Sequence, residues 1–430
     1  MEAKNDGLIE TTRKLGSSIG GMIGERSFEE LELAFVTKLF PKKFANMSTL
    51  RTRQHILLYW RRGFLKTTLL QEFSKTIPNK FKIVRLSSAT TEILCGSINI
   101  PKSPFQQPRI VPPVLAGADF TIILEHSAFL KHGGSMVAKV SILNDIFEGD
   151  RISTSLVKLG QTQIDPSQRF ELEKLGVTYN PSEATISYEP DILMLSASHP
   201  FDAKTLSILV DSGHLDRFRI VQCKITPEMA RNTFGGDFCI DTTLQEQLRN
   251  QNEELCKTEI KSIDAPIHAM LKPIYDRLFA LTEIPDFRIK GDIIRTVAAH
   301  MVVRHFDQGN VKEVYTDQDY TVEDTQFICE RISEFVQPRT SPLVSEGYSG
   351  TTRKRDETKE LTCTFLKTSY GQGIAGEPLR AIIAYVQNRM SNVHYQTIIN
   401  ALQELLSEHK LEKVPDMHGY YRLVEKKERS

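Results

Sequence analysis

Short apolar runs alternate with amphipathic stretches over about 310 residues upstream of position 337. Runs of this length bounded by polar residues are typical of buried strands, and the stretches between them have the apolar spacing of helices. Such alternation predicts an α/β domain with a largely parallel sheet that is buried on both faces. The strand candidates are HILLYW (55–60), FKIVRLSS (81–88), FTIILEH (120–126), DILMLSAS (191–198) and FRIVQCKI (218–225).

The pattern changes twice further along the chain. From 265 to 336 it is wholly helical, which predicts a helical lid subdomain attached to the sheet. Residues 337–356 are rich in Pro, Ser, Gly and Thr and end in a basic cluster, as expected of an exposed linker. We therefore expect an N-terminal tail at 1–26 and an α/β core at 27–264.

The last segment, 357–430, contains three helical stretches followed by two short strands joined by the turn DMHG. Three helices closed by a β-hairpin is the outline of a winged helix. A small helical dimerisation module is the alternative interpretation of this segment.

Composition limits the class of protein. The 430 residues include 54 Lys+Arg and 54 Asp+Glu, with 40% hydrophobic and 25% charged residues, as in ordinary globular proteins. This excludes a disordered polyelectrolyte and a uniformly basic nucleic-acid coat. No apolar run is long enough to predict a membrane span. Six scattered cysteines without a CxxC or Cys/His cluster argue against disulfides and zinc and favour a reducing cytoplasmic location.

The charge is distributed unevenly. Between Leu33 and Gln71 there is no Asp or Glu, yet eight Lys or Arg occur. This stretch surrounds an apolar strand followed by Gly63 and by Lys66-Thr67 at the start of a helix. Backbone N–H groups, a helix N-terminus and a lysine in this arrangement can hold a triphosphate, with Lys66 at the terminal phosphates and Thr67 at Mg²⁺. ATP and Mg²⁺ are therefore the predicted cofactors.

The phosphate-loop motif is incomplete. A Walker A loop has the pattern GxxxxGK[ST], but Trp60 and Leu65 stand where its two glycines should be. Both glycines normally let the backbone approach phosphate closely. On its own, this segment is therefore weak support for nucleotide binding.

The neighbouring strands strengthen the interpretation. One apolar strand ends in Glu125-His126, where an NTPase has an acid beside Mg²⁺ and a residue that polarises the attacking water. Another ends in small polar residues and His199, the usual form of a γ-phosphate sensor. Taken singly, each segment reads equally well as a plain buried strand, but their order and spacing favour an NTPase.

Two arginines complete the pattern. Arg217 comes just before a strand, and Arg288 opens a later helix. Ring ATPases place an arginine finger, supplied across a subunit boundary, and a second-sensor arginine at these positions. A surface arginine is the alternative for each.

Residues 27–336 resemble the AAA+ module of MCM helicases, the hexameric replicative helicases of archaea and eukaryotes. The resemblance implies a P-loop ATPase core with a helical lid, a homo-oligomeric ring that is a hexamer in the family, and DNA as the partner. The similar segments are WRRGFLKTTLL (60–70; family pattern GDPGxAKSxLL), VLAGADFTIILEH (114–126), SASHP (196–200; AANP), LDRFRI (215–220; LSRFDL) and FRIKGDIIRTVAAHMVVRHF (287–306; TxRQLExLIRLAEAxAK).

The departures from the family predict impaired hydrolysis. Glu125 replaces the Asp that coordinates Mg²⁺, His126 the catalytic Glu and His199 the sensor Asn, and the residues before 27 do not match the family's N-terminal domain. Negative phosphates would raise the pKa of a histidine at position 126 and make it a poor base. Because loss of such a group costs about 10²–10⁴ in rate, we expect ATP binding with slow or absent hydrolysis. Lys66, Thr67, Arg217 and Arg288 are retained.

Two regions are candidates for DNA contact. The acid-free segment 96–117 contains Lys102 and Arg109, and the resemblance implies a pore-lining hairpin there and a second one within 151–190. The wing of the C-terminal domain offers Lys413 and Arg422. Residues 351–430 have 13 Lys+Arg against 10 Asp+Glu, so we expect only modest phosphate affinity, and solvated loops or a protein contact remain alternatives.

The sequence thus predicts an MCM-like AAA+ ATPase that acts on DNA in replication as helicase, initiator or translocase. The alternative is an assembly or regulatory protein that binds nucleotide and DNA without productive hydrolysis. A third interpretation is an inactive homologue that serves as a scaffold and binds no nucleotide.

Overall fold

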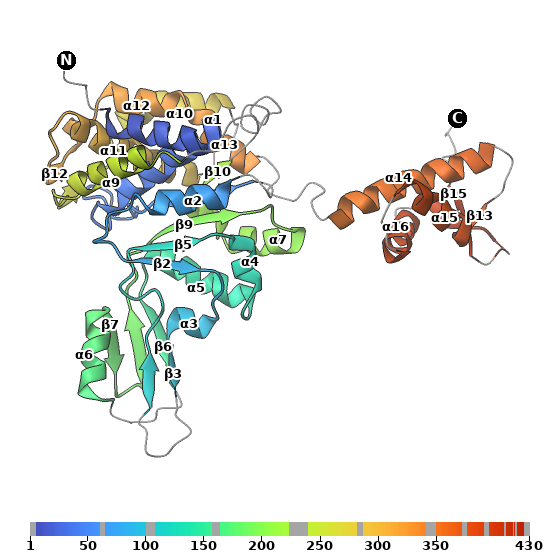
Figure 1. Cartoon of the computed structure of the whole chain (residues 1–430), viewed down its shortest axis with the longest axis horizontal. Coiled ribbons are helices and arrows are strands. Elements are labelled where there is room, and N and C mark those ends of the chain that lie inside the picture. The colour runs from blue at the N-terminus through green and yellow to red at the C-terminus, as the bar shows by residue number, and fades with distance from the viewer. Residues whose placement is uncertain are drawn as a thin grey trace. The chain divides into compact units, whose positions relative to one another are not determined.

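The chain forms two compact units, Met1–Val344 and Ser345–Ser430, which we describe separately (Figure 1). The structure is a computed structural model. It describes residues 6–60, 65–99, 108–156, 164–222, 240–281, 287–340, 350–371, 376–390, 395–407, 410–415, 417 and 419–424.

A five-stranded parallel sheet lies at the centre of the first unit. Its order is β10-β1-β9-β5-β2, so β9 lies between β1 and β5. Every strand of this sheet falls in one of the five apolar runs, and the prediction of a parallel α/β sheet is confirmed. The strands are β1 (His55–Tyr59), β2 (Ile83–Leu86), β5 (Phe120–Ile123), β9 (Leu193–Ser198) and β10 (Phe218–Gln222).

Both faces of the sheet are buried, because alternate residues of each strand belong to different cores. Leu57 and Met194 join a core formed with α4 (His126–Lys131) and α5 (Met136–Glu148). On the opposite face Ile56, Leu58 and Leu195 pack against helices that include α1 and α2. A sheet covered by helices on both faces explains why its strands read as continuous apolar runs. The helices α1 (Leu8–Lys38) and α2 (Lys66–Ser74) lie on this second face. The helices α3 (Thr91–Cys95) and α7 (Ala203–Asp211) lie on the same face as α4 and α5.

The N-terminal segment corrects the expected tail at 1–26. Residues 8–38 form α1, a helix interrupted at Gly20 and Gly21, where the backbone leaves the helical region. The two halves touch so closely that a Cβ on Gly16 would lie 2.3 Å from the carbonyl oxygen of Gly24. Leu8 and Leu15 are fully buried. The segment is therefore a helical hairpin that belongs to the core.

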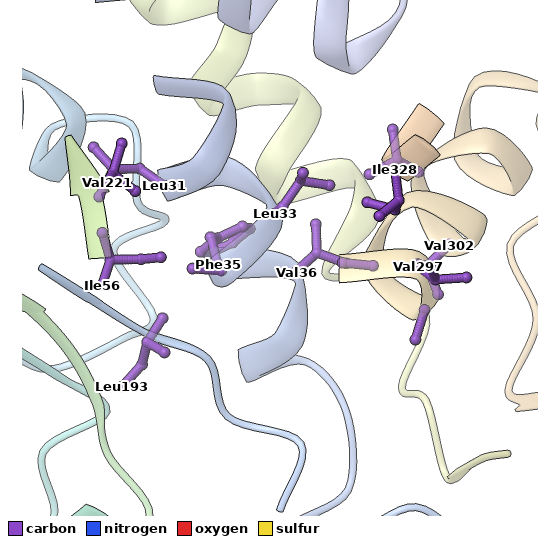
Figure 2. Close-up of a cluster of buried hydrophobic side chains, with 14 of the residues drawn as sticks. Leu31, Leu33, Phe35, Val36, Ile56, Leu193, Val221, Val297, Val302 and Ile328 are labelled. Carbon is purple, nitrogen blue, oxygen red and sulfur yellow. The ribbon is translucent and has the colours of Figure 1, made fainter. Parts of the chain in front are cut away.

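Helix α1 lies between the sheet and the remaining helices (Figure 2). Leu31 and Phe35 of α1 share one apolar cluster with Val221 of β10 and with Val297 and Ile328 of the helical region. The predicted helices at 265–336 are present, but their core is continuous with that of the sheet. They are α10 (His268–Leu281), α11 (Phe287–Asp307), α12 (Val322–Cys329) and α13 (Ile332–Thr340), joined by α9 (Thr242–Leu255) and the short parallel pair β11 (Ser262–Ile263) and β12 (Val314–Tyr315).

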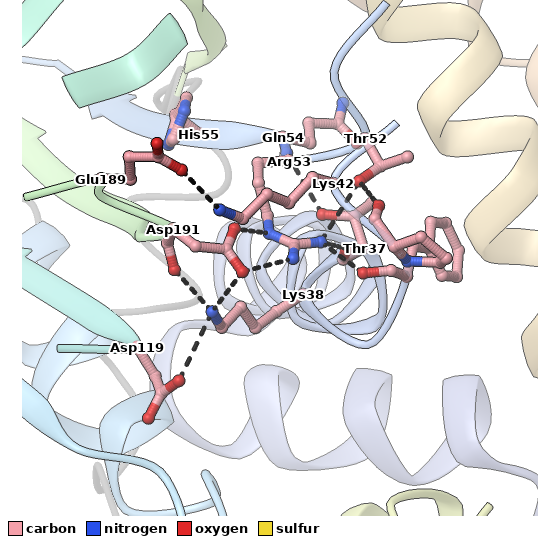
Figure 3. A network of polar contacts seen from close by, with 12 residues as sticks. Thr37, Lys38, Lys42, Thr52, Arg53, Gln54, His55, Asp119, Glu189 and Asp191 are labelled. Carbon is pink, nitrogen blue, oxygen red and sulfur yellow. Dashed lines mark hydrogen bonds and ion pairs between the residues drawn. The ribbon is translucent and has the colours of Figure 1, made fainter. Parts of the chain in front are cut away.

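Part of the acid-free basic stretch is structural (Figure 3). Arg53 donates to both carboxylate oxygens of Asp191, at 2.8 and 2.9 Å, and to the carbonyls of Thr37 and Phe40. Lys38 lies 3.4 Å from the same carboxylate. Burial would raise the pKa of Asp191, but these cations lower it to about 2. Both cations thus fasten α1 to the sheet and are not available to a ligand.

A smaller lobe extends beyond the sheet (Figure 1). Strands β3 (Ser97–Asn99) and β4 (Arg109–Val111) form an antiparallel hairpin, and an antiparallel sheet has the order β6-β8-β7. Gln168 of α6 donates to the carbonyl of Ile110 at 3.1 Å and so joins the two parts. The β3–β4 hairpin and the β6-β8-β7 sheet lie in the two segments where hairpins were expected, 96–117 and 151–190. The other elements are β6 (Ile152–Ser155), α6 (Pro166–Lys174), β7 (Val177–Asn180) and β8 (Thr185–Tyr188).

The described residues of the second unit form three helices and a three-stranded antiparallel sheet of order β13-β15-β14 around an apolar core of their own. The three predicted helices and two predicted strands are present, and β13 is an addition. Helices α13 and α14 extend into the expected linker, which leaves 341–349 outside the described residues. The elements are α14 (Gly350–Gly371), β13 (Glu377–Pro378), α15 (Leu379–Arg389), α16 (Tyr395–Ser407), β14 (Leu411–Lys413) and β15 (Tyr420–Leu423).

Among the residues that the structure describes, none of the helices combines the length and apolar character needed to span a bilayer.

Candidate functional site

The carboxyl edge of the sheet brings three of the predicted residues to neighbouring strands. Lys66 follows β1, His199 follows β9 and Glu125 follows β5, and these strands are adjacent in the sheet. After β1 the chain continues to β2 at one side, whereas after β9 it crosses β1 to β10 at the other side. Ligands of open α/β sheets bind at such a reversal, outside the carboxyl ends of the strands.

Glu125 and His199 contact each other directly. Nε2 of His199 lies 2.8 Å from Oε2 of Glu125, and the other carboxylate oxygen accepts from the Ser127 hydroxyl at 2.6 Å. Burial raises the pKa of Glu125, but the hydrogen bonds from His199 and Ser127 outweigh it, and the pKa is lowered. The carboxylate is therefore an anion at neutral pH, held at the tip of β5.

The phosphate-loop candidates are only partly described. Gly63 lies outside the described residues, whereas Lys66 opens α2 and is 4% exposed, and the Thr67 side chain is exposed. Leu65, at the second glycine position of the motif, has the left-handed conformation with φ 50°. Trp60 donates its backbone N–H to Ser198, and its side chain packs against the apolar core.

The oxygen ligands at the carboxyl edge suit Mg²⁺ only together with a nucleotide. Among the described residues no group of three or more His, Cys, Asp or Glu gathers closely enough to hold a metal ion. Mg²⁺ is commonly held by one or two carboxylates plus substrate phosphates and water. Glu125 and the Thr67 hydroxyl fit that role, provided that His199 releases one oxygen of Glu125.

His126 points away from this edge into the core. Its side chain is fully buried, with Nδ1 3.0 Å from the Ser196 hydroxyl and Nε2 3.0 Å from Nε2 of His214. Burial lowers its pKa to about 4. The expected role of His126 beside the phosphates is therefore corrected, because both ring nitrogens are engaged inside the protein and the ring is neutral.

Arg217 and Arg288 meet at the opposite edge of the sheet. Both donate to the carbonyl of Gly213, at 2.7 and 3.1 Å. Arg217 also pairs with Glu148 at 2.9 Å, and Arg288 pairs with Asp216 at 2.8 Å. The structure thus brings the two arginines together on one carbonyl.

The two edges are too far apart for one chain to join these groups. Arg217 precedes β10, whose first residue is in register with His55, the first residue of β1. Five strand residues at about 3.3 Å each separate that end from the segment leading to Lys66, a distance of about 16 Å. In a single chain the arginine pair therefore lies away from Lys66 and Glu125.

A cavity of about 480 Å³ opens beside the arginine pair. No sequence pattern predicted this cavity. A partial signal was present, because Arg51 belongs to the acid-free stretch and Lys290 follows Arg288 by two positions. The lining residues are Met47, Thr49, Leu50, Arg51, Arg53, His55, Phe147, Glu148, Asp216, Arg217, Arg288, Lys290, Gly291, Ile294 and Arg295.

The candidates for DNA contact differ in their surroundings. Lys102 lies outside the described residues. Arg109 is exposed on β4, 3.4 Å from the carboxylate of Glu171. In the second unit Lys413 is exposed on β14, and Arg422 of β15 is 2.6 Å from Glu412.

No protein-family model matches the chain, and no curated protein matches it.

Proposed function

We propose that the chain is an MCM-like AAA+ ATPase that binds ATP and Mg²⁺ and acts on DNA in replication as a ring homo-oligomer, with slow hydrolysis. One observation carries this proposal. Lys66 and Glu125 lie at the carboxyl edge of the sheet, whereas Arg217 and Arg288 lie at the amino edge, and the strand between these edges is about 16 Å long. A ring of copies, hexameric as the resemblance implies, would bring the arginines of one chain to the nucleotide of the next.

The topology supports the same proposal. The strand that ends at His199 lies between the strand before Lys66 and the strand before Glu125, so the groups that would surround a triphosphate converge. The hairpin β3–β4 supports a pore-lining role for segment 96–117. In the second unit three helices with an antiparallel sheet support a winged helix, with Lys413 and Arg422 on paired strands of the wing.

At the proposed site Lys66 would contact the terminal phosphates and Glu125 would hold the Mg²⁺ that neutralises them. His199 would leave Glu125 and donate to the γ-phosphate. The position of the family's catalytic Glu is occupied by His126, which is bonded within the core. We therefore attribute slow hydrolysis to the lack of a base from this position, a loss of about 10²–10⁴ in rate.

The same observation on His126 favours the second candidate function. In that case the chain binds nucleotide and DNA without turnover and acts as an assembly or regulatory protein. The pairs Arg217–Glu148 and Arg288–Asp216 would then rearrange only when a neighbouring chain brings its nucleotide.

The test measures ATP affinity, ATP turnover, assembly and strand displacement on the same preparation, with and without DNA. We expect micromolar ATP binding that is lost in Lys66→Ala, and ATP-dependent assembly that is lost in Arg217→Ala. Lys272→Ala is the control, since it removes an exposed lysine of α10 that lies away from both edges.

Strand displacement that needs both Lys66 and Arg217 would support the helicase. Nucleotide-dependent assembly without turnover would support the regulatory protein. Absence of ATP binding in the unaltered chain would refute both and leave a scaffold.

A further inference from the structure

The cavity at the amino edge of the sheet is strongly cationic. Six cationic side chains line it, against the two carboxylates of Glu148 and Asp216. Both carboxylates are already paired, with Arg217 and Arg288. The surplus of positive charge in a concave site favours a ligand with more than one negative charge. The cationic lining residues are Arg51, Arg53, Arg217, Arg288, Lys290 and Arg295.

These cations are engaged to different degrees. Arg53 is bonded to Asp191, and Arg295 donates to the Arg51 carbonyl and to Asp292. Arg51 reaches Asp150 only at 4.0 Å, beyond hydrogen-bonding distance. Lys290 lies 5.9 Å from the Tyr275 ring and has no salt bridge to a carboxylate of the described residues. Arg51 and Lys290 are therefore the groups with donors to offer.

The rest of the cavity wall is apolar or neutral. Met47, Leu50, Phe147 and Ile294 contribute carbon surface. His55 packs against Phe147 with ring centroids 4.6 Å apart and ring planes tilted by 44°, and burial lowers the pKa of its imidazole to about 3. A volume of about 480 Å³ lies in the range of small-molecule sites. The cavity can thus accept a phosphate chain alone or one that carries an organic group.

We propose that this cavity is an anion site of the single chain, which binds a multivalent phosphate, either a free polyphosphate or the phosphates of a nucleotide, through Arg51 and Lys290. This goes beyond the proposed function, because it needs neither the phosphate loop nor a neighbouring copy. The bound anion competes with Glu148 and Asp216 for Arg217 and Arg288. Occupancy of the cavity therefore loosens the contacts that hold the arginine pair.

The experiment uses the full chain with Lys66→Met, which retains the aliphatic stem of the lysine and removes the charge of the phosphate loop. Inorganic pyrophosphate is titrated by calorimetry at constant ionic strength. We expect one site per chain. Arg51→Ala and Lys290→Ala should each weaken binding roughly tenfold, as expected for the loss of a charged hydrogen-bond partner. Lys272→Ala, on the surface of α10, should leave the affinity unchanged.

A second variant fills the cavity without changing its charge. A Cβ at Gly291 would lie 3.2 Å from Leu50 and 3.3 Å from Arg295, so Gly291→Leu introduces carbon into the space. It should abolish pyrophosphate binding and preserve the circular dichroism spectrum. ADP that binds more tightly than pyrophosphate would identify the organic group as part of the ligand, and equal affinities would identify free polyphosphate.

Two results would overturn the proposal. The first is no pyrophosphate binding by the Lys66→Met chain while the unaltered chain binds it, which would assign the anion to the phosphate loop. The second is binding that is unchanged by Arg51→Ala, Lys290→Ala and Gly291→Leu. ATP affinity that is unchanged by Lys66→Ala, with pyrophosphate binding retained in the Lys66→Met chain, would count against the proposed function and leave the cavity site standing.

Discussion

Leu65 is strained at a position where the phosphate-loop motif has glycine. Its φ of 50° lies in the left-handed region, which costs a residue with a Cβ about 1–2 kcal/mol. At this one position the chain adopts a conformation that favours glycine, without having a glycine. The Cβ also stands where the backbone would approach a phosphate.

We therefore expect Leu65→Gly to bind ATP more tightly, by roughly fivefold or more. Leu65→Ala is the matched control, because it removes the isobutyl group but keeps the Cβ and the strained φ. Fluorescence titration with a labelled ATP measures both. Equal gains in the two variants would show that side-chain bulk, and not the glycine backbone, limits binding.

Glu32 is a buried carboxyl that forms no ion pair within the described part of the chain. It accepts from the Asn252 amide at 3.3 Å, and its other oxygen has no hydrogen-bond partner among the described residues. Burial raises its pKa from 4.5 to about 8, in spite of the Asn252 hydrogen bond. The folded chain therefore retains a proton that the unfolded chain has released.

Stability should consequently fall as pH rises from about 4.5 to about 8, on the order of 1 kcal/mol per pH unit from this group. Glu32→Gln cannot ionise and should be the more stable variant at pH 8, with the difference vanishing near pH 4.5. Urea unfolding at several pH values measures this. Glu246→Gln, exposed on α9, should change little, and a Glu32→Gln chain with unaltered pH dependence would contradict the assignment.

At the scale of elements, α4, α5, β9 and the loop before β10 are joined by one buried chain of hydrogen bonds. The Asn144 amide donates to the Ser212 carbonyl, so its oxygen accepts from Nδ1 of His214 at 2.8 Å. With both histidines neutral, Nε2 of His214 accepts from His126, and Nδ1 of His126 accepts from the Ser196 hydroxyl. In this arrangement each donor has one acceptor.

Protonation of His126 at low pH should therefore disrupt this series of hydrogen bonds. Burial lowers the folded pKa of His126 from 6.5 to about 4, so stability is present above pH 6.5 and declines as pH falls toward 4. His126→Phe keeps an aromatic ring but leaves Nε2 of His214 without its hydrogen-bond partner, which should cost about 1–3 kcal/mol at neutral pH. It should also flatten the pH dependence between 6.5 and 4. Thermal unfolding at several pH values measures both effects, and turnover lost without loss of stability would restore a catalytic role.

Sequence patterns predicted the sheet better than the helices around it. The five central strands are apolar runs because the sheet is buried on both faces, and parallel strands place Glu125 beside His199 at one edge. The first half of helix α1, up to residue 26, was predicted to be a tail because Gly16 to Gly24 reads as a flexible polar segment. Its partners are remote, since Leu8 bonds to Asp307, 299 residues away. The burial of His126 likewise depends on His214, 88 positions downstream, which no local pattern indicates.

At the scale of the whole molecule, the separation of the two edges makes the proposed ATP site a property of two chains. Lys66→Ala and Arg217→Ala should each be inactive alone. Rings assembled from equal amounts of the two variants should recover about a quarter of the sites. Each working site needs an intact Lys66 from one chain and an intact Arg217 from its neighbour. The readout is ATP turnover or, where turnover is too slow, retention of bound ATP on gel filtration. No recovery on mixing, with normal assembly, would contradict a site shared between chains.

The position of α1 also bears on how the chain is made. The Leu8 N–H bonds to Asp307, and Glu29 pairs with Arg331, 302 residues further along. At about 5–20 residues per second, a ribosome needs about 15–60 s to deliver these partners after the helix has emerged. During that interval the side of the hairpin that packs against α11 has no partner. Nascent chains should therefore depend on chaperones until the last helices of the first unit have been synthesised.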